Sequence, residues 1–329
     1  MTTRGAGRAT GAPEPVRIGV FGTGALGRHH TRILAELPGA DLVGVYDPRE
    51  DQARAAAEPY GARVFPSAEE LAGTVEAAVA AVPTVAHADV GCELLGRGLH
   101  VLVEKPLAPS LAEADRLLQA AEDAGAVLAV GHVEFFNPAV KALLGALPAA
   151  EPVSGGGGPR FVEVQRLARF TPRSLDVDVV LDLMIHDLQI LHALDPTPVT
   201  EVRATGIDVL SPRIDIANVR LELGSGCVAN LTASRVSSDR VRKLRVFASS
   251  RYFSVDYQDQ EVKGYRLEED GGGEREIRRT DLRVERAEPL RRELEAFLAA
   301  CRGERTRIVT GSEGRRALDT ALRVVEAIG

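Results

Sequence analysis

The chain has 329 residues, of which 45% are hydrophobic, so it is long enough for about two domains, each with a core of its own. Its 40 basic and 47 acidic residues give a net charge of −7. This balance excludes an overall positive field that would gather nucleic acid or an anionic membrane. No apolar run approaches the ~20 residues needed to span a bilayer, so membrane insertion is not expected.

The three cysteines, Cys92, Cys227 and Cys301, are odd in number and far apart. They fit neither a disulfide framework nor a metal-knuckle spacing, and we interpret them as small buried apolar residues of a cytoplasmic protein. Residues 1–15 lack the apolar centre of a signal peptide and are expected to form a disordered tail. The Ser154–Gly158 run (SGGGG) is expected to be an exposed loop.

Short apolar runs alternate with amphipathic segments of helix length between residues 16 and 131. The predicted strands are Val16–Phe21, Leu42–Tyr46, Ala77–Val82, His100–Val103 and Val127–Val130, and the predicted helices cover about residues 25–37, 49–58, 85–96 and 110–123. Runs too apolar to alternate, separated by helices, predict a doubly wound parallel sheet covered on both faces. Residues 16–131 are therefore expected to form an α/β domain.

The pattern changes after Gly131. A strong helix is predicted at about residues 177–194, and β-like segments follow at residues 199–210, 215–223, 226–235, 241–248, 252–257 and 261–268. These segments predict a second, α+β domain over residues 132–311, with a large open sheet that is mainly antiparallel. The final helix, residues 312–329, is a candidate to cross back onto the first domain.

A glycine-rich turn follows the first predicted strand and opens the first helix. Gly22-Thr23-Gly24-Ala25-Leu26-Gly27 reads GxGxxG. Gly22 suits the tight turn, Gly24 lets a pyrophosphate approach the backbone, and Gly27 lets the helix pack closely on the strand. This context predicts a dinucleotide site.

Asp47 ends the second predicted strand, twenty residues after Gly27. Its carboxylate is placed to accept hydrogen bonds from the adenosine ribose, and its charge would repel a 2′-phosphate. NAD is therefore favoured over NADP. Two observations leave the alternative open: Asp47-Pro48 could simply begin a turn, and Arg49 could tolerate a phosphate.

Glu104-Lys105-Pro106 follows the strand at His100–Val103, at the edge of the sheet where open α/β folds bind ligands. Lysine is rare in this chain, with Lys105 one of only four, whereas arginine is abundant. An ammonium beside a nicotinamide and a hydroxyl would stabilise a developing alkoxide. The alternative interpretation is a solvated turn.

The predicted helix at about residues 177–194 carries a polar stripe on a very apolar segment. Asp178, Asp182, His186 and Gln189 are spaced to share one helical face, which must meet water or a ligand. An imidazole can remove a hydroxyl proton near neutral pH, and a carboxylate one turn away can orient it. A solvent-facing stripe remains open, whereas a metal pair at Asp182 and His186 lacks an evident third ligand, so no metal is expected.

These motifs together resemble the Gfo/Idh/MocA family, named for glucose-fructose oxidoreductase, inositol dehydrogenase and MocA. The resemblance covers nearly the whole chain and rests on Gly22–Gly27, Val82-Pro83-Thr84 with His87, His100–Pro106, and the Asp182/His186 pair. It implies a Rossmann domain and a C-terminal domain whose open sheet makes contacts in dimers or tetramers. The chain departs from many relatives at Glu134-Phe135-Phe136, where an arginine is common. That departure argues against transferring the free-sugar enzymes' substrate contacts unchanged.

The resemblance also implies roles for individual residues. Lys105 would contact substrate beside the nicotinamide, and His186 would be the acid/base group. Asp182 would contact the substrate and act as the partner of the base. It further implies a cis Lys105–Pro106 bond. The expected cofactor-binding residues are Gly22, Thr23, Gly24, Ala25, Leu26, Gly27, Asp47, Pro83, His87, Glu104 and Lys105. For His87 a packing or capping role is an equal alternative, and His132 is a candidate to line the cleft.

Asp176–Asp187 and Cys227–Arg235 further resemble the UDP-N-acetylglucosamine 3-dehydrogenases, a bacterial branch that supplies a 3-amino sugar for lipid A. That resemblance implies hydride transfer from C3 to NAD while His186 takes the hydroxyl proton. Arg166, Arg169 and Arg173 are candidates by charge for the UDP moiety, or else solvated surface arginines. Asn137 is a further candidate substrate contact. The alternatives are an inositol or free-sugar dehydrogenase, a reductase of a keto sugar or imine, and a non-catalytic NAD(H) sensor.

Overall fold

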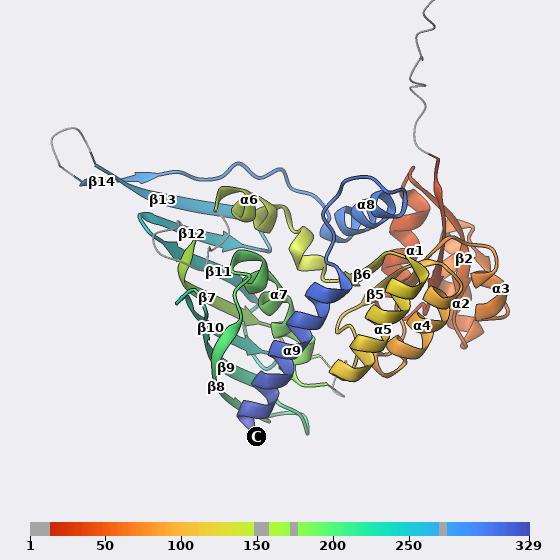
Figure 1. Ribbon diagram of the computed structural model, residues 1–329, viewed down its shortest axis with the longest axis horizontal. Helices are drawn as coiled ribbons and strands as arrows, with labels where there is room; N and C mark the ends of the chain where they lie inside the picture. Colours follow the sequence, from red (N-terminus) through yellow and green to blue (C-terminus); the bar gives the residue numbers. More distant parts are fainter. Residues whose placement is uncertain (1–13, 148–157, 172–176, 270–274) are drawn as a thin grey trace, which may run out of the picture.

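Two β-sheets with their helices stand side by side in the computed structural model (Figure 1), which describes residues 14–147, 158–171, 177–269 and 275–329. The expected tail and the expected glycine-rich loop therefore lie almost wholly outside the described residues. In the part of the chain that is described, no helix is long and apolar enough to cross a membrane. All three cysteines are free thiols, and only Cys227 is fully buried, because Cys92 and Cys301 keep partial exposure.

The first sheet has six parallel strands in the order β3-β2-β1-β4-β5-β6. The strands are β1 (Val16–Phe21), β2 (Ala40–Tyr46), β3 (Arg63–Val64), β4 (Ala77–Ala80), β5 (His100–Glu104) and β6 (Leu128–Gly131). The direction in which strands are added reverses between β1 and β4. At such a switch point, open α/β sheets bind ligands beyond the carboxyl ends of their strands.

Helices cover both faces of this sheet, because its strands are apolar on both sides. They are α1 (Gly27–Glu36), α2 (Glu50–Ala57), α3 (Ala68–Ala72), α4 (His87–Gly96), α5 (Leu111–Ala124) and α8 (Pro289–Cys301). Ile33 of α1 and Phe297 of α8 share one buried cluster with Ile18. Leu117 of α5 packs with Val101 on the other side of the sheet. The predicted doubly wound α/β architecture is confirmed.

The second sheet has eight strands in the order β14-β13-β12-β11-β7-β10-β9-β8. They are β7 (Pro159–Leu167), β8 (Val199–Ile207), β9 (Ile216–Leu223), β10 (Val228–Ser234), β11 (Val241–Ala248), β12 (Arg251–Asp256), β13 (Glu261–Glu269) and β14 (Arg275–Arg279). Only the β7–β10 pair among these described strands is parallel. A large, mainly antiparallel second sheet is thus confirmed.

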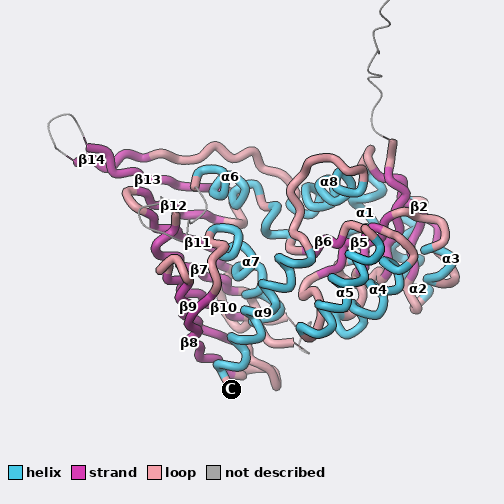
Figure 2. Tube along the Cα trace, in the orientation of Figure 1, coloured by secondary structure: helices cyan, strands magenta, loops and turns pink. Residues whose placement is uncertain are grey.

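Helices α6 (Pro138–Ala146), α7 (Ile185–Leu194) and α9 (Gly311–Ile328) lie against one face of the second sheet (Figure 2). The opposite face carries a row of aromatic rings across β7, β11, β12 and β13. Phe161, Phe247, Tyr252 and Tyr265 contact their neighbours in this row with ring centroids between 4.8 and 5.9 Å apart. Phe247 remains 38% exposed, so this face offers apolar surface to solvent.

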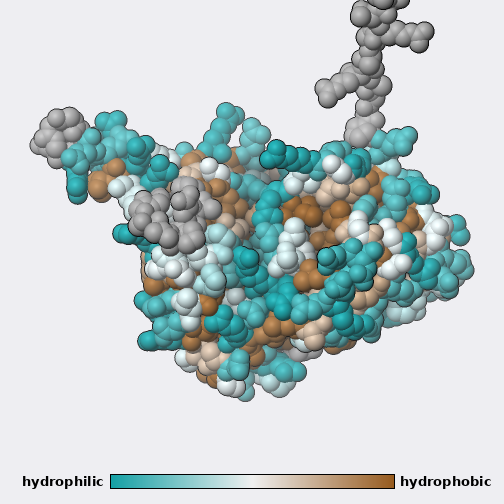
Figure 3. All heavy atoms as spheres, viewed as in Figure 1, coloured by the Kyte–Doolittle hydropathy of each residue, from teal (hydrophilic) through white to brown (hydrophobic). Residues whose placement is uncertain are grey.

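The C-terminal part of the chain connects the two sheets. Val309 and Thr310 run antiparallel to β6, with the Val130 amide donating to the Val309 carbonyl. Helix α9 then packs against α5 at one end and against α7 and β8 further along. Viewed from the same side, the surface is mostly hydrophilic, and hydrophobic residues gather near α8 between the two halves (Figure 3).

Asp215 anchors the β8–β9 loop beside the helix that carries Asp182. Its Oδ2 accepts backbone hydrogen bonds from Val209, Leu210 and Ser211 at 2.6 to 2.9 Å. Burial opposes its ionisation, but these bonds outweigh burial and lower the pKa of Asp215 to about 2. The next residue back, Ile214, donates to Asp178 Oδ1 at 3.1 Å and so ties the loop to the helix start.

We expect Asp215→Asn to lower stability by about 1–3 kcal/mol, because an amide nitrogen would face backbone donors. Thermal unfolding checks this, with the exposed Asp208→Asn as the matched control. The folded pKa lies below the ordinary value of 3.8, so the charge stabilises the fold above that pH and the contribution is lost as pH falls towards 2. The difference between variant and parent should shrink in acid, and equal midpoints at neutral pH would contradict this assignment.

Candidate active site

The glycine-rich turn is built so that two of its glycines serve the fold and one leaves room. Gly22 has φ +87°, and a Cβ there would lie 2.5 Å from the Ala81 carbonyl oxygen. A Cβ on Gly27 would lie 1.9 Å from the Gly22 carbonyl oxygen. At Gly24 the nearest neighbour of a Cβ would be the Gln52 amide nitrogen, 3.8 Å away. The turn is therefore open at Gly24, next to the uncapped N-terminus of α1.

Asp47 lies at the end of β2 and faces this turn. Its Oδ2 accepts hydrogen bonds from the Thr23 amide at 2.8 Å and from the Gln52 side chain at 2.7 Å, and its Oδ1 accepts from the Arg49 amide at 3.0 Å. Burial disfavours the charged form, yet these donors outweigh burial and lower the pKa of Asp47. Oδ2 carries most of the bonds, so Oδ1 keeps acceptor capacity for a ribose hydroxyl.

His87 bridges two backbone segments at the carboxyl edge of the sheet. Its Nε2 faces the Val82 carbonyl at 2.9 Å and its Nδ1 faces the Pro106 carbonyl at 2.8 Å, and the residue is only 1% exposed. It therefore acts on the cofactor edge by holding the loop after β4, which contains Pro83, against the turn after β5. This arrangement favours the packing alternative for His87.

The Glu104-Lys105-Pro106 turn ends β5, and its Lys105–Pro106 bond is cis, as expected. Glu104 is buried and its Oε1 lies 2.6 Å from His30 Nε2 of α1. Glu104 Oε2 accepts from the Lys105 amide at 3.2 Å. Lys105 Nζ then reaches across to Asp182, donating to its carbonyl oxygen at 2.6 Å and to Oδ1 at 3.1 Å.

The predicted long α-helix is locally a π-helix, which corrects the expected spacing. Residues Val180–Met184 form a π turn, with the Ile185 amide bonded to the Val180 carbonyl, before α7 begins. The Asp182 carbonyl that receives Lys105 belongs to this wider turn. Such turns occur frequently at functional sites. The predicted polar stripe is not one continuous face. Asp178 accepts a hydrogen bond from the Ile214 amide, and Gln189 is 2% exposed, with no hydrogen-bond partner for its Oε1 among the described residues. Neither residue therefore lines a ligand site together with Asp182.

His186 is buried beside Lys105 and His132. Its ring meets the His132 ring edge-on, with centroids 5.7 Å apart, and its Nδ1 has no hydrogen-bond partner among the described residues. Burial first, and then the positive charges of Lys105, Arg166 and Arg242, hold the pKa of His186 well below its ordinary value of 6.5. Burial and Lys105 likewise lower the pKa of His132 to about 3. Both imidazoles are therefore neutral at physiological pH.

The arginine expected to meet a nucleotide is instead part of a buried salt-bridge network. Arg166 is 2% exposed and pairs with both oxygens of Asp187, at 2.6 and 2.8 Å, and with Glu134 at 2.9 Å. Arg166 is therefore not a solvated surface arginine, because two carboxylates from distant segments, one of them in α7, pair with it. Its role as a substrate contact stays a prediction. Asn137 is likewise occupied: it caps α6 and donates to the Tyr257 carbonyl at 3.0 Å.

The other two candidate arginines stay predictions. Arg169 is exposed and donates to the Ser238 carbonyl at 2.9 Å, and Arg173 lies outside the described residues. Sequence reasoning missed Arg242 of β11. It pairs with Glu134 at 3.0 Å, its side chain is 29% exposed, and its charge acts on His186. The unusual acidic residue at Glu134 was the available signal, because a buried carboxylate requires cations nearby.

The described residues contain no group of three or more His, Cys, Asp or Glu side chains arranged to hold a metal ion. Lys105 follows β5 of the first sheet, whereas Asp182 and His186 belong to the π turn and to α7, which lies against the second sheet. The three residues meet at the carboxyl end of β5. The geometry suits a cofactor at Gly22–Gly27 and Asp47, with a proton acceptor and an ammonium beside it. Dehydrogenation of an alcohol needs a hydride acceptor, a base and a group that stabilises negative charge, and a neutral imidazole and an ammonium are suited to the last two roles.

Known proteins identify the family. A family model described as an oxidoreductase family with an NAD-binding Rossmann fold, GFO_IDH_MocA, matches residues 16–132. UDP-N-acetylglucosamine 3-dehydrogenase of Acidithiobacillus ferrooxidans is 37% identical over 317 residues, which cover 95% of this chain and 97% of that protein. The chain belongs to the Gfo/Idh/MocA oxidoreductase family.

Other similarities agree with this assignment. The solved structure of the A. ferrooxidans enzyme aligns with a TM-score of 0.86 at 36% identity, covering 95% of this chain and 98% of that one. Myo-inositol 2-dehydrogenase of Thermotoga maritima is 27% identical over 324 residues, covering 92% of this chain and 93% of that protein. As a Gfo/Idh/MocA member, the chain is an NAD(P)-dependent dehydrogenase, and the resemblance drawn from sequence motifs is confirmed.

The two glycine substitutions with opposite environments separate fold from cofactor binding. Gly27→Ala should destabilise by roughly 2–4 kcal/mol or prevent folding, because its Cβ would overlap the Gly22 carbonyl. Gly24→Ala fits the free protein, so its thermal midpoint should stay unchanged, whereas its Kd for NADH should rise roughly tenfold or more as the methyl group blocks the pyrophosphate. Thermal unfolding and NADH fluorescence titration check both, and a folded Gly24→Ala variant with parental affinity would contradict this site.

Proposed function

We propose that this dehydrogenase oxidises the 3-hydroxyl of UDP-N-acetylglucosamine to the 3-keto sugar, the precursor of a 3-amino sugar for lipid A. The observation that carries the proposal is full-length similarity, 37% identity over 95% of the chain, to a protein named UDP-N-acetylglucosamine 3-dehydrogenase. The meeting of Lys105, Asp182 and His186 at the end of β5 supports it, because oxidation of a ring hydroxyl needs a base and a group that stabilises negative charge.

His186 is the proposed base. Its lowered pKa keeps it neutral at physiological pH, so it can accept the hydroxyl proton. The positive charges that lower this pKa also favour an alkoxide over an alcohol nearby. The same charges keep His186 a weak base, so that it releases an accepted proton readily.

Lys105 is the proposed charge stabiliser, and Asp182 its positioning partner. Nζ is held by the carbonyl and the carboxylate of Asp182, which leaves one of its three N–H donors for a substrate oxygen. The side chain is 12% exposed, so its charge is only weakly screened. NAD, when bound, accepts the hydride from the carbon that carries the hydroxyl.

NAD is the proposed cofactor in preference to NADP. The Asp47 carboxylate keeps its charge because its hydrogen bonds lower its pKa, and a 2′-phosphate would meet that charge. Arg49 is the neighbouring cation, with a side chain 68% exposed, and it lies 3.7 Å from Asp47 Oδ1. The Asp47 carboxylate thus partly neutralises Arg49, the neighbouring cation that could bind a 2′-phosphate.

For the diphosphate of the substrate we propose Arg242 rather than Arg166. Arg242 shares Glu134 with Arg166 but is partly exposed, and only one of its nitrogens, Nη1, bonds to Glu134. Its remaining N–H groups are donors that suit phosphate oxygens. The expected homodimer or homotetramer stays a prediction, which the apolar outer face of the second sheet supports.

The first test is oxidation of UDP-N-acetylglucosamine with NAD in the presence of a carbonyl trap, followed by NADH absorbance. His186→Gln should lower kcat by roughly 10²–10⁴-fold while NADH binding is retained, because only the proton acceptor is lost. His29→Gln, an exposed histidine of α1, is the matched control and should behave as the parent. Turnover of myo-inositol or glucose in place of the nucleotide sugar would overturn the substrate assignment, and unchanged turnover by His186→Gln would overturn its role.

The second test addresses the cofactor. Asp47→Ser should reduce the preference for NAD over NADP, measured as a ratio of kcat/KM values, by roughly 10–100-fold, since a charge-assisted hydrogen bond contributes about 1.5–3 kcal/mol. Asp41→Ser, an exposed aspartate of the same strand, should leave the ratio unchanged. Equal losses with both cofactors would mean that Asp47 acts only by holding the Thr23 turn.

A further inference from the structure

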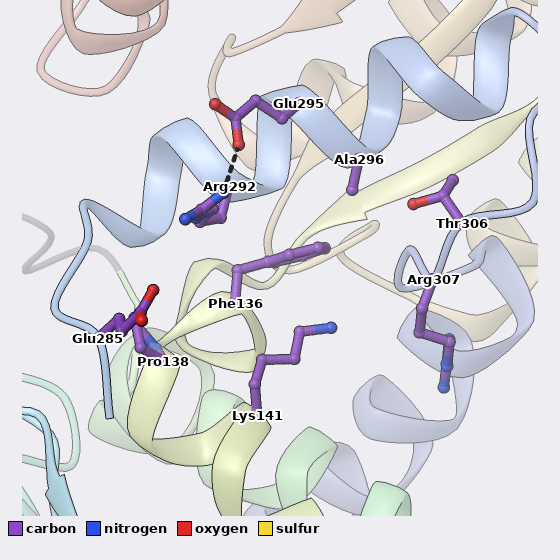
Figure 4. Close-up of a pocket in the computed structure, with 9 residues that line it drawn as sticks. All are labelled: Phe136, Pro138, Lys141, Glu285, Arg292, Glu295, Ala296, Thr306 and Arg307. Carbon is purple, nitrogen blue, oxygen red and sulfur yellow. Dashed lines mark hydrogen bonds and ion pairs between the residues drawn. The ribbon is translucent and has the colours of Figure 1, made fainter. Parts of the chain in front are cut away.

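A cavity of about 560 Å³ lies between α6, α8 and the segment that precedes α9 (Figure 4). Its lining residues are Phe136, Pro138, Lys141, Glu285, Arg292, Glu295, Ala296, Thr306 and Arg307. None of these is among the residues assigned to cofactor or substrate. The volume falls within the range of ~300–1,000 Å³ typical of small-molecule sites. A second cavity of about 390 Å³ adjoins it and shares Lys141 and Arg307.

Lys141 is the feature that distinguishes this cavity from an ordinary surface hollow. Its Nζ lies 4.0 Å from the ring centroid of Phe135 and 4.8 Å from that of Phe136. No carboxylate forms an ion pair with it among the described residues, although the chain is acidic overall. In the close-up its ammonium group points into the space between Phe136 and Arg307.

The other cations of the cavity are already paired. Arg292 contacts Glu295 at 3.2 Å, and Arg307 is held by both carboxylate oxygens of Glu313 at the start of α9. Among the cations of the described lining, Lys141 is therefore the one without a carboxylate partner. The exposed Glu285 is the other unpaired charge of this lining, and it is negative. Cation–π contact with two rings compensates the charge of an ammonium only in part.

We propose that this cavity is a binding site, separate from the dehydrogenase cleft, for a small organic anion. Its carboxylate or phosphate would pair with Lys141, with the Thr306 hydroxyl and Arg307 beside it. Its flat or apolar part would lie on Phe136 and Ala296, which supply the apolar wall.

The protonation of Lys141 supports this assignment. Burial and the nearby charge of Arg307 lower its pKa to about 8. A bound anion favours the ammonium form, so binding near or above that pH takes up a proton. The affinity should therefore fall as pH rises through about 8. The charges that act on the pKa of Lys141 are Arg307 and, in the opposite direction, Glu313. The other charged groups of the cavity lining are Glu285, before α8, and Arg292 and Glu295 of α8.

The proposal does not depend on the sugar substrate. The turn Val133–Phe136 lies between the cavity and the cleft, because Phe136 lines the cavity whereas Glu134 pairs with Arg166 and Arg242. Failure of either assignment can therefore be recognised without the other.

The test is calorimetric titration of the full chain with phenyl phosphate and benzoate, first alone and then with saturating NADH and UDP present to occupy the cleft. Phenol, which has the ring without the charge, is the matched ligand and should bind at least tenfold more weakly. Lys141→Gln should weaken anion binding roughly tenfold or more, Lys141→Arg should restore most of it, and the exposed Lys263→Gln should change nothing. For the parent, affinity should fall roughly tenfold between about pH 7 and about pH 9.5.

Several results would overturn the site. Binding of neither anion to the parent chain would do so, as would equal binding by Lys141→Gln. Anion binding that NADH or UDP abolishes would assign these ligands to the dehydrogenase cleft instead. If Lys141→Gln does not fold, the pH dependence of the parent and the Lys141→Arg variant still decide the question.

Discussion

The contact of Lys105 with Asp182 is the interaction on which the rest of the site depends. The ammonium comes from the end of β5 in the first sheet, and both of its acceptors belong to one residue of the π turn before α7. Two acceptors on one residue fix the position of Nζ more closely than a single ion pair would. This pair therefore fixes the position of the turn after β5 relative to the helix that carries His186. Its role is to position these two elements rather than to add much stability.

The charged groups in this region contact partners that come from distant parts of the chain. Glu104 below Lys105 is paired with His30, and Arg166 and Arg242 on the second sheet are balanced by Glu134 and Asp187. Burial and the positive charges of Lys105, Arg166 and Arg242 lower the pKa of His186. An imidazole that is neutral among cations can accept a proton from an alcohol, and the same cations would stabilise the alkoxide that remains.

Local motifs were predictable from sequence, whereas arrangements set by long-range packing were not. The turn Gly22–Gly27 requires glycine at Gly22 and Gly27, so its geometry can be predicted from six consecutive residues. The π turn gave no such signal, because residues 180–184 also suit an α-helix. Arg166 looked like a free cation, since its partners lie 21 and 32 residues away. Helix α8 was not predicted, although Leu294, Phe297 and Leu298 repeat at helical spacing. The sequence assigned that region to the second domain, whereas these side chains pack in a cluster with strands of the first sheet.

The few lysines of this arginine-rich chain separate by environment. Lys243 and Lys263 are exposed on the second sheet, whereas Lys105 and Lys141 are partly buried, one in the cleft and one in the cavity beside Phe135. A guanidinium stays charged at any physiological pH and spreads its charge over a planar fork. An ammonium concentrates its charge on one atom and can lose its proton when it is buried. The two lysines that lie partly inside the molecule, Lys105 and Lys141, are thus the two for which we propose a small ligand.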